Sequence, residues 1–170
     1  MGVKDSRDTS LNTKKIVYVD MDNVLVDFQS GLDRVSEALK AEYADDGTGK
    51  PHYDDIPGIF SLMDPIPGAI EAMQELNKSF DLYILSTAPW LNPSAWSGKL
   101  EWVQRHFGKG EKSIFYKRLI ISHHKDLNLG DFLIDDRTKN GAKEFMGELI
   151  QFGSTKFPDW PAVVTYLCNR

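Results

Sequence analysis

The sequence predicts an α/β protein in which a parallel sheet is flanked by helices and carries a small, mostly helical insertion after its first strand. Short apolar runs alternate with segments of helical periodicity, which is typical of strand–helix–strand crossovers. Several of these runs end directly in polar residues, as strands do at the ligand-binding edge of an open α/β sheet. One long, largely polar stretch interrupts the alternation at about residues 31–64, and it predicts a cap over that edge.

The elements of the first half follow from apolar spacing. Residues 14–20 read as a buried strand because they contain the apolar run 16–19, and residues 30–43 have the spacing of a helix. Residues 44–57 then turn polar, and their acids lack the alternation of a calcium-binding loop, so we expect a solvated surface. Residues 69–78 predict a second helix, and residues 81–85 a second strand.

In the second half, residues 89–98 are interpreted as a loop that contains Trp and Pro, and residues 100–107 as a helix. Gly108 supplies the expected end of that helix. Further apolar runs and helical spacings predict strands at 118–121, 132–134 and 149–152, and helices at 138–146 and 158–167.

The length and composition favour one domain. Residues 1–13 are polar and have no apolar signal core, so we expect a flexible lead, followed by a single domain over residues 14–170. With 41% hydrophobic and 26% charged residues, the 170-residue chain resembles ordinary soluble proteins. The only cysteine is Cys168, which excludes an internal disulfide framework and suits a cytoplasmic protein.

The net charge also limits the partners. A charge of −5 argues against a broad nucleic-acid surface, which is normally basic. No apolar run approaches the roughly 18 residues of a membrane span. We therefore expect a small-molecule partner and neither a nucleic acid polymer nor a membrane, while a homodimer is left open.

Polar side chains follow four of the predicted strands. Because the carboxyl ends of parallel strands lie at one edge of a sheet, these side chains are expected to meet there. Taken alone, each has an ordinary explanation, such as a strand exit, a surface lysine or a helix cap. Their joint occurrence at successive strand ends favours a functional site. The set is Asp20, Asp22, Ser86, Thr87, Lys125, Asp135 and Asp136.

This set suits phosphoryl transfer. Several carboxylates at one edge repel each other unless a cation lies between them, and Mg²⁺ accepts both carboxylate and phosphate oxygens. Asp20 is the expected nucleophile and Asp22 the expected acid and base, while Lys125 and the two hydroxyls bind the phosphate. The expected metal ligands are Asp20, the backbone carbonyl of Asp22, and Asp136, with Asp135 nearby or acting through water.

These motifs resemble those of the haloacid dehalogenase superfamily of phosphatases. Asp20-Met21-Asp22-Asn23-Val24 is similar to the first motif, Ser86 or Thr87 to the second, Lys125 to the third and Asp135-Asp136 to the fourth. The resemblance implies a Rossmann-like core and a magnesium-dependent route through an aspartyl-phosphate. Asn23 stands where glycine is common, and it is compatible with a left-handed turn.

From about Lys15 onward the chain resembles the 5′(3′)-deoxyribonucleotidases more specifically. That resemblance implies that Phe28 lines the nucleoside pocket, and that Thr87 and Lys99 bind phosphate beside Lys125. His123 stands where the family commonly has arginine, and the family's aromatic lid residues have no clear match here. The similar elements are 20–28, Ile66-Pro67-Gly68-Ala69-Ile70, Ser86-Thr87-Ala88-Pro89, Lys99-Leu100-Glu101-Trp102-Val103, His106-Phe107-Gly108 and Leu133-Ile134-Asp135-Asp136-Arg137.

Three functions follow from these observations. The first is a magnesium-dependent phosphatase of nucleoside monophosphates, with 5′(3′)-deoxyribonucleotides as the expected substrates. The second is a phosphatase of another small phosphate ester in the same superfamily. The third is a catalytically silent domain that binds a phosphorylated ligand or a protein partner. Asp20, Asp22 and Lys125 count against the third, because a silent domain has no need of all three.

Overall fold

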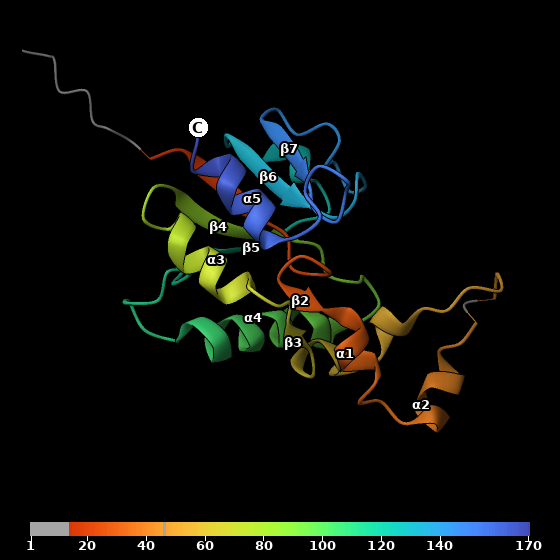
Figure 1. Ribbon diagram of the computed structural model, residues 1–170. Coiled ribbons are helices and arrows are strands. Elements are labelled where there is room, and N and C mark those ends of the chain that lie inside the picture. Colours follow the sequence, from red (N-terminus) through yellow and green to blue (C-terminus); the bar gives the residue numbers. More distant parts are fainter. Residues whose placement is uncertain (1–13, 46) are drawn as a thin grey trace, which may run out of the picture.

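The computed structural model describes residues 14–45 and 47–170, so the expected flexible lead at 1–13 lies outside the described residues. A five-stranded parallel sheet with the order β5-β4-β1-β6-β7 forms the body of the protein (Figure 1), which confirms the α/β class. The first strand, β1, is central; β4 and β5 follow on one side of it, and β6 and β7 lie on the other side. Ligands of such sheets bind at the carboxyl end of the central strand. The strands are β1 (Ile16–Val19), β4 (Asp81–Ser86), β5 (Leu119–Ile121), β6 (Phe132–Asp135) and β7 (Glu148–Gln151).

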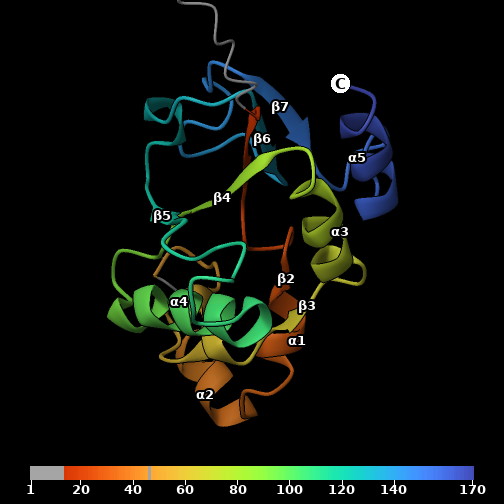
Figure 2. The same cartoon turned by 90° about the vertical axis from the view of Figure 1, so that its left-hand side faces the viewer.

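The two faces of the sheet are covered differently. Side chains alternate along β1, so Val17 and Val19 point to one face of the sheet and Tyr18 points to the other. The face of Val17 and Val19 packs against α3 (Ala69–Leu76) and α5 (Trp160–Leu167), which lie side by side in Figure 2. These two helices confirm the predictions for residues 69–78 and 158–167.

Turns cover the opposite face, where residues 138–146 were wrongly predicted to form a helix. Asn140 and Gly141 have φ values of 54° and 79°, and this left-handed backbone cannot continue a right-handed helix. The turns still bury Ala142 and Phe145 against the sheet. The apolar residues are therefore buried as their spacing indicated, but Asn140 and Gly141, which precede them, prevent a helix.

A second correction concerns α4, which spans Pro93–Phe107 rather than 100–107. Proline is favourable in the first turn of a helix, because the missing N–H would have no partner there. The helix ends as predicted at Gly108, whose φ is 95° and whose N–H donates to the Gln104 carbonyl at 3.0 Å. The extra turns bring α4 alongside the inserted segment (Figure 1).

The inserted segment leaves and returns through a short antiparallel pair, β2 (Val26–Asp27) and β3 (Asp64–Pro65). We call residues 28–63 between these strands the cap. The expected helix over 30–43 is two helices, capped by the side chains of Asp27 and Ser36. The cap holds α1 (Phe28–Leu32), α2 (Glu37–Glu42) and the 3₁₀ turns η1 (Tyr53–Asp55) and η2 (Ile59–Ser61).

The second half of the cap is fixed to α4, and we call residues 51–63 the cap wall. Trp102 Nε1 donates to the Met63 carbonyl at 2.9 Å, and Arg105 donates to the Ser61 carbonyl at 2.7 Å. A Cβ on Gly98 would lie 3.2 Å from Phe60 Cβ, so the missing side chain lets the wall approach the helix closely. None of the helices in the described part of the chain is long and apolar enough to cross a membrane.

Candidate active site

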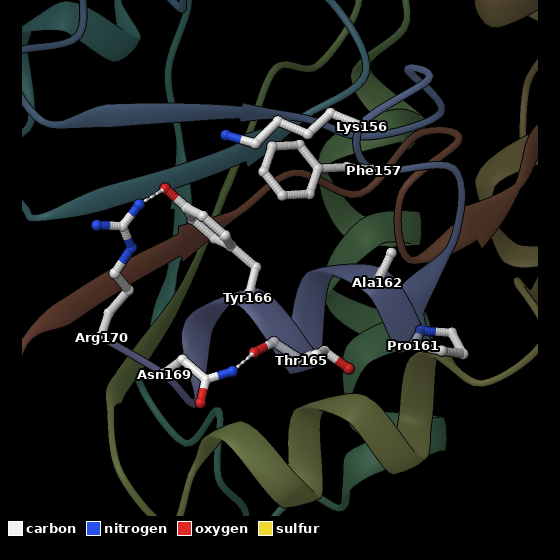
Figure 3. A pocket seen from close by; sticks show the side chains of 8 residues that line it. All are labelled: Lys156, Phe157, Pro161, Ala162, Thr165, Tyr166, Asn169 and Arg170. Atoms are coloured by element: carbon white, nitrogen blue, oxygen red, sulfur yellow. Dashed lines mark hydrogen bonds between the residues drawn. The ribbon is translucent and has the colours of Figure 1, made fainter.

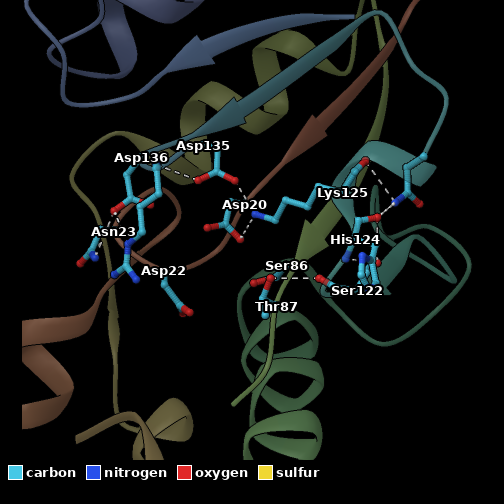
Figure 4. A network of polar contacts seen from close by, with 12 residues as sticks. Asp20, Asp22, Asn23, Ser86, Thr87, Ser122, His124, Lys125, Asp135 and Asp136 are labelled. Carbon is cyan, nitrogen blue, oxygen red and sulfur yellow. Dashed lines mark hydrogen bonds and ion pairs between the residues drawn. The ribbon is translucent and has the colours of Figure 1, made fainter. Parts of the chain in front are cut away.

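Asp20 is the first residue beyond β1, and it lies at the centre of the predicted sheet edge (Figure 4). Its N–H donates to the Ile134 carbonyl at 2.9 Å, which continues the ladder between β1 and β6. Its side chain is buried, with Oδ1 at 3.0 Å from Lys125 Nζ. The strand therefore fixes the backbone of Asp20, and the neighbouring ammonium faces its carboxylate.

Lys125 lies between two acids. It occupies the 3₁₀ turn η3 (Lys125–Leu127), is 3% exposed, and pairs with both Asp20 and Asp135. Burial alone would lower the pKa of Lys125, but the negative charges of Asp20 and Asp135 outweigh burial and raise it. The lysine is therefore held in its charged form. Its N–H donates to the Asn140 carbonyl at 2.8 Å, so the turns at 138–146 also hold this residue.

Asp20, Asp135 and Asp136 offer carboxylate oxygens that all lie within 4.8 Å of one another. Asp135 uses Oδ2 for Lys125 and accepts the Arg137 N–H with Oδ1 at 2.9 Å. By contrast, Asp136 Oδ1 is buried and accepts no hydrogen bond from any residue that the structure describes. A buried carboxylate oxygen without a partner is costly, and carboxylate oxygens are the ligands of hard cations, so the donor set fits such an ion.

The pKa values of the acid pair agree with this fit. Burial raises the pKa of Asp136. Burial and the charge of Asp20 raise the pKa of Asp135 to about 6, although Lys125 opposes the change. Both carboxyl groups would hold their charge more easily beside a cation. Asp136 has the unpartnered oxygen, whereas both oxygens of Asp135 are used within the protein.

Asp22 lies on the cap side of Asp20. Between β1 and β2 the chain turns at Asn23, whose φ of 57° confirms the predicted left-handed turn. Asp22 Oδ1 accepts a hydrogen bond from Lys99 Nζ at 2.7 Å. Burial raises the pKa of Asp22, and the charge of Lys99 offsets only part of that effect. A raised carboxyl pKa suits a group that must release and take up a proton.

The carboxyl end of β4 brings Ser86 and Thr87 to the same edge of the sheet as Asp20 (Figure 4). Ser86 is fully buried, and its Oγ accepts from Lys99 Nζ at 3.1 Å. The Thr87 hydroxyl donates to the Ser122 carbonyl at 3.0 Å, which ties the ends of β4 and β5 together. Lys99 thus links the carboxyl end of β4 to Asp22.

Phe28 lines a pocket of about 240 Å³ that opens beside Asp22. The pocket also contains residues that the sequence did not identify as site residues, namely Asn23, Pro51, Tyr53, Asp54 and Arg137. Arg137 could have been found, because it directly follows the acid pair. Tyr53 and Asp54 carried no such sign, because their position depends on how the cap wall folds.

A larger hollow of about 720 Å³ lies along α5 (Figure 3). Its two cations, Lys156 and Arg170, both lie over the Tyr166 ring, 4.6 and 4.4 Å from its centroid. The Arg170 carbonyl accepts a hydrogen bond from Lys15, just before β1, at the opposite end of the strand from Asp20. This hollow therefore holds none of the predicted catalytic groups, and the candidate active site remains the smaller pocket beside Asp22.

The chain is similar to known proteins over most of its length. The family model of the cytosolic type C 5′ nucleotidase, deoxy (pyrimidine), matches residues 49–157. A protein of Vibrio phage KVP40 with the provisional name 5′(3′)-deoxyribonucleotidase is 61% identical over 157 residues, which cover 92% of this chain and 86% of the phage protein. The chain belongs to the 5′(3′)-deoxyribonucleotidase family. It is therefore an enzyme, a phosphoric monoester hydrolase.

More distant members and folds extend this assignment. The cytosolic 5′(3′)-deoxyribonucleotidase of Homo sapiens is 33% identical over 178 residues, covering 91% of this chain and 81% of the human protein. The fold is similar to that of the HAD hydrolase YfnB from Bacillus subtilis, with a TM-score of 0.51 at 13% identity, over 86% of this chain and 90% of that one. This chain thus has the haloacid dehalogenase-like core that the sequence led us to expect.

Proposed function

We propose that the protein hydrolyses deoxyribonucleoside 5′- or 3′-monophosphates in a magnesium-dependent reaction through an aspartyl-phosphate on Asp20. One observation carries the proposal. The buried carboxylate of Asp20 lies 3.0 Å from Lys125 and within a cluster of three acids, at the carboxyl end of the central strand. The relatives named as 5′(3′)-deoxyribonucleotidases support the choice of substrate.

In the first step a carboxylate oxygen of Asp20 forms a bond to phosphorus, and the bond between phosphorus and the ester oxygen breaks. Asp22 gives its proton to the departing alkoxide, which leaves as a nucleoside hydroxyl. The position of Asp22, beside both Asp20 and the pocket lined by Phe28, suits this role. Phe28 then contacts the nucleoside.

In the second step Asp22, now a carboxylate, takes a proton from water. The water oxygen bonds to phosphorus, and the bond from phosphorus to the Asp20 oxygen breaks. Inorganic phosphate leaves, and Asp20 and protonated Asp22 are restored. The same carboxyl group therefore serves as acid and then as base.

The remaining groups bind the transferring phosphoryl group. Lys125 offsets the charge of Asp20 and of the phosphoryl oxygens. Ser86 and Thr87 at the end of β4, and Lys99 on α4, bind these oxygens. Asp20, Asp136 and the backbone carbonyl of Asp22 would hold Mg²⁺, with Asp135 keeping Lys125 in place. When bound, the ion neutralises negative charge on the phosphoryl oxygens.

The test compares Asp20→Asn with Asp22→Asn on p-nitrophenyl phosphate and on deoxyribonucleoside monophosphates, with Mg²⁺ and with chelator. p-Nitrophenolate leaves without a proton, so Asp22→Asn should release at most about one p-nitrophenol per site in a burst and then stall. Asp20→Asn should give no burst, and the wild type should be inactive in chelator. A burst from Asp20→Asn, or full wild-type turnover in chelator, would contradict the proposal.

A panel of substrates tests the specificity in the same assay. Deoxyribonucleoside monophosphates should be hydrolysed with a higher kcat/KM than ribonucleoside monophosphates or sugar phosphates. Equal or better rates with sugar phosphates would favour the alternative of another small phosphate ester. No turnover of any compound, in a folded protein with Mg²⁺, would favour the silent domain.

A further inference from the structure

The ammonium group of Lys99 has three neighbours that belong to three different parts of the molecule. It lies 2.7 Å from Asp22 Oδ1 and 3.1 Å from Ser86 Oγ. Its third neighbour is the ring of Phe60 in the cap wall, whose centroid is 4.4 Å from Nζ. Lys99 itself is fully buried on α4. A helix residue thus connects the expected general acid with the cap wall.

The ring of Phe60 restricts where this ammonium can go. A lysine side chain has four flexible carbon–carbon bonds, so two hydrogen bonds alone do not fix its head group. The aromatic face attracts the charge and fills the space on that side. Phe60 is itself only 3% exposed and packs edge-on against Phe28 at 6.2 Å between ring centroids.

The held ammonium in turn orients Asp22. Among the described residues, Lys99 is the one that donates to the Asp22 carboxyl group, and it bonds Oδ1. The other oxygen, Oδ2, is left to serve the ester oxygen of a substrate. A shift of Lys99 would let the carboxyl group rotate, and proton transfer requires an atom within hydrogen-bond reach.

We propose that Phe60 is a positioning residue: through Lys99, its ring fixes the orientation in which Asp22 gives a proton to the leaving oxygen. The proposal rests on the function proposed above, in which Asp22 is the general acid. It assigns the cap wall a part in the chemical step, besides its part in forming the pocket.

The test uses two small substrates that differ in the leaving group and carry no nucleoside. Phenolate is more basic than p-nitrophenolate, so phenyl phosphate needs the proton more. The value of kcat/KM reports the steps up to departure of the first product, before water attacks. Phe60→Leu should lower kcat/KM for phenyl phosphate about 10-fold more than for p-nitrophenyl phosphate, because a small misplacement of a catalytic group is costly.

Matched variants separate positioning from a general loss of structure. Arg105→Met removes another anchor of the same 3₁₀ turn, the hydrogen bond to the Ser61 carbonyl, and leaves Lys99 its bonds to Asp22 and Ser86. It should change both substrates equally. Phe60→Tyr keeps an aromatic face and should restore the wild-type ratio. Phe60→Met, which is closer to Phe in length, replaces Phe60→Leu if the latter does not fold.

Asp22→Asn in the same assay distinguishes two kinds of failure. If Asp22→Asn lowers both substrates equally, the general-acid role is wrong, and the proposed function fails with it. If Asp22→Asn separates the substrates but Phe60→Leu and Phe60→Met do not, only the role of Phe60 is overturned. A ratio changed as much by Arg105→Met would also overturn it.

Discussion

The carboxyl edge of the sheet and the cap wall meet at the same pocket, but they are built in different ways. At the edge, each group is fixed by the main chain of a strand or of the turn that follows it, as for Asp20 and Lys125. The wall instead depends on side chains of α4 that bind its carbonyls, such as Trp102 to Met63. Regular backbone thus places the expected chemistry, while irregular contacts shape the pocket.

This difference predicts that changes at the edge reduce the chemistry most. Lys125→Met should lower kcat by about 10²-fold or more for nucleotides and for p-nitrophenyl phosphate alike, because an electrostatic stabiliser of the transferring group is lost. Lys139→Met, an exposed lysine in the turns behind it, is the control and should have little effect. Steady-state rates of both proteins, checked for folding by circular dichroism, decide the matter. A near wild-type rate for Lys125→Met would show that the ion pairs serve structure alone.

A smaller effect is expected within the acid pair. Asp136→Asn should raise the Mg²⁺ concentration for half-maximal activity by at least about 10-fold, a loss expected even for outer-shell partners of a metal. Asp136 has the buried, unpartnered oxygen, whereas Asp135 uses both oxygens for Lys125 and the Arg137 N–H. Asp135→Asn should therefore lower kcat more than metal affinity. The reverse pattern, measured by magnesium titration of activity, would exchange the two assignments.

The same difference explains what could be predicted from the sequence. The sheet and its strand ends were predictable, because apolar runs and the polar residues after them are local patterns, as in 16–20 and 132–136. The helix at 138–146 was wrong, because apolar spacing cannot show that Asn140 and Gly141 adopt positive φ. Tyr53 and Asp54 were missed because the cap wall is held by hydrogen bonds from α4 and from Asn92 at its start, and these donors lie 38 to 44 residues from their acceptors.

Two glycines with similar φ values, one in each region, allow the stability of the two regions to be compared. Gly141 has a φ of 79°, and a Cβ there would lie 2.0 Å from Asp126 Oδ1, next to Lys125. Gly58 in the cap wall has a φ of 77° and nothing within 4 Å of its Cβ position. Gly58→Ala should therefore cost only the backbone strain, about 1–2 kcal/mol of unfolding free energy.

Gly141→Ala should cost more than Gly58→Ala, because the clash with Asp126 adds to the same strain. Urea unfolding of both variants gives the two free energies. Gly141→Ala should also lower kcat, since the turn that holds the Lys125 N–H must shift. Equal unfolding free energies would mean that the Asp126 side chain moves aside at no cost.

The smallest expected effect is a pH dependence in the contact between α4 and the wall. His106 is half-buried, with its ring centroid 4.4 Å from that of Trp102. Burial, followed by the charge of Arg105, lowers the pKa of His106 below its ordinary value, although Asp64 opposes this. The unfolded chain therefore binds the proton more readily than the folded one. The stability contributed by neutral His106 is complete above the unfolded pKa of about 6.5, and it is lost as the pH falls through the lower folded pKa.

Urea unfolding between about pH 7.5 and about pH 5.5 tests this effect, because histidine is the side chain that ordinarily titrates there. The wild type should lose unfolding free energy over this range, and His106→Gln should lose less, because it has no proton to bind. His124 is exposed, so His124→Gln is the control and should lose as much unfolding free energy as the wild type. Since His106 is only partly buried, solvent reduces the difference, and it should be the smallest of the effects predicted for the wall. A steeper loss in His106→Gln than in the wild type would reverse the sign and show that the charged imidazole is favoured beside Trp102, as a cation over an aromatic ring can be.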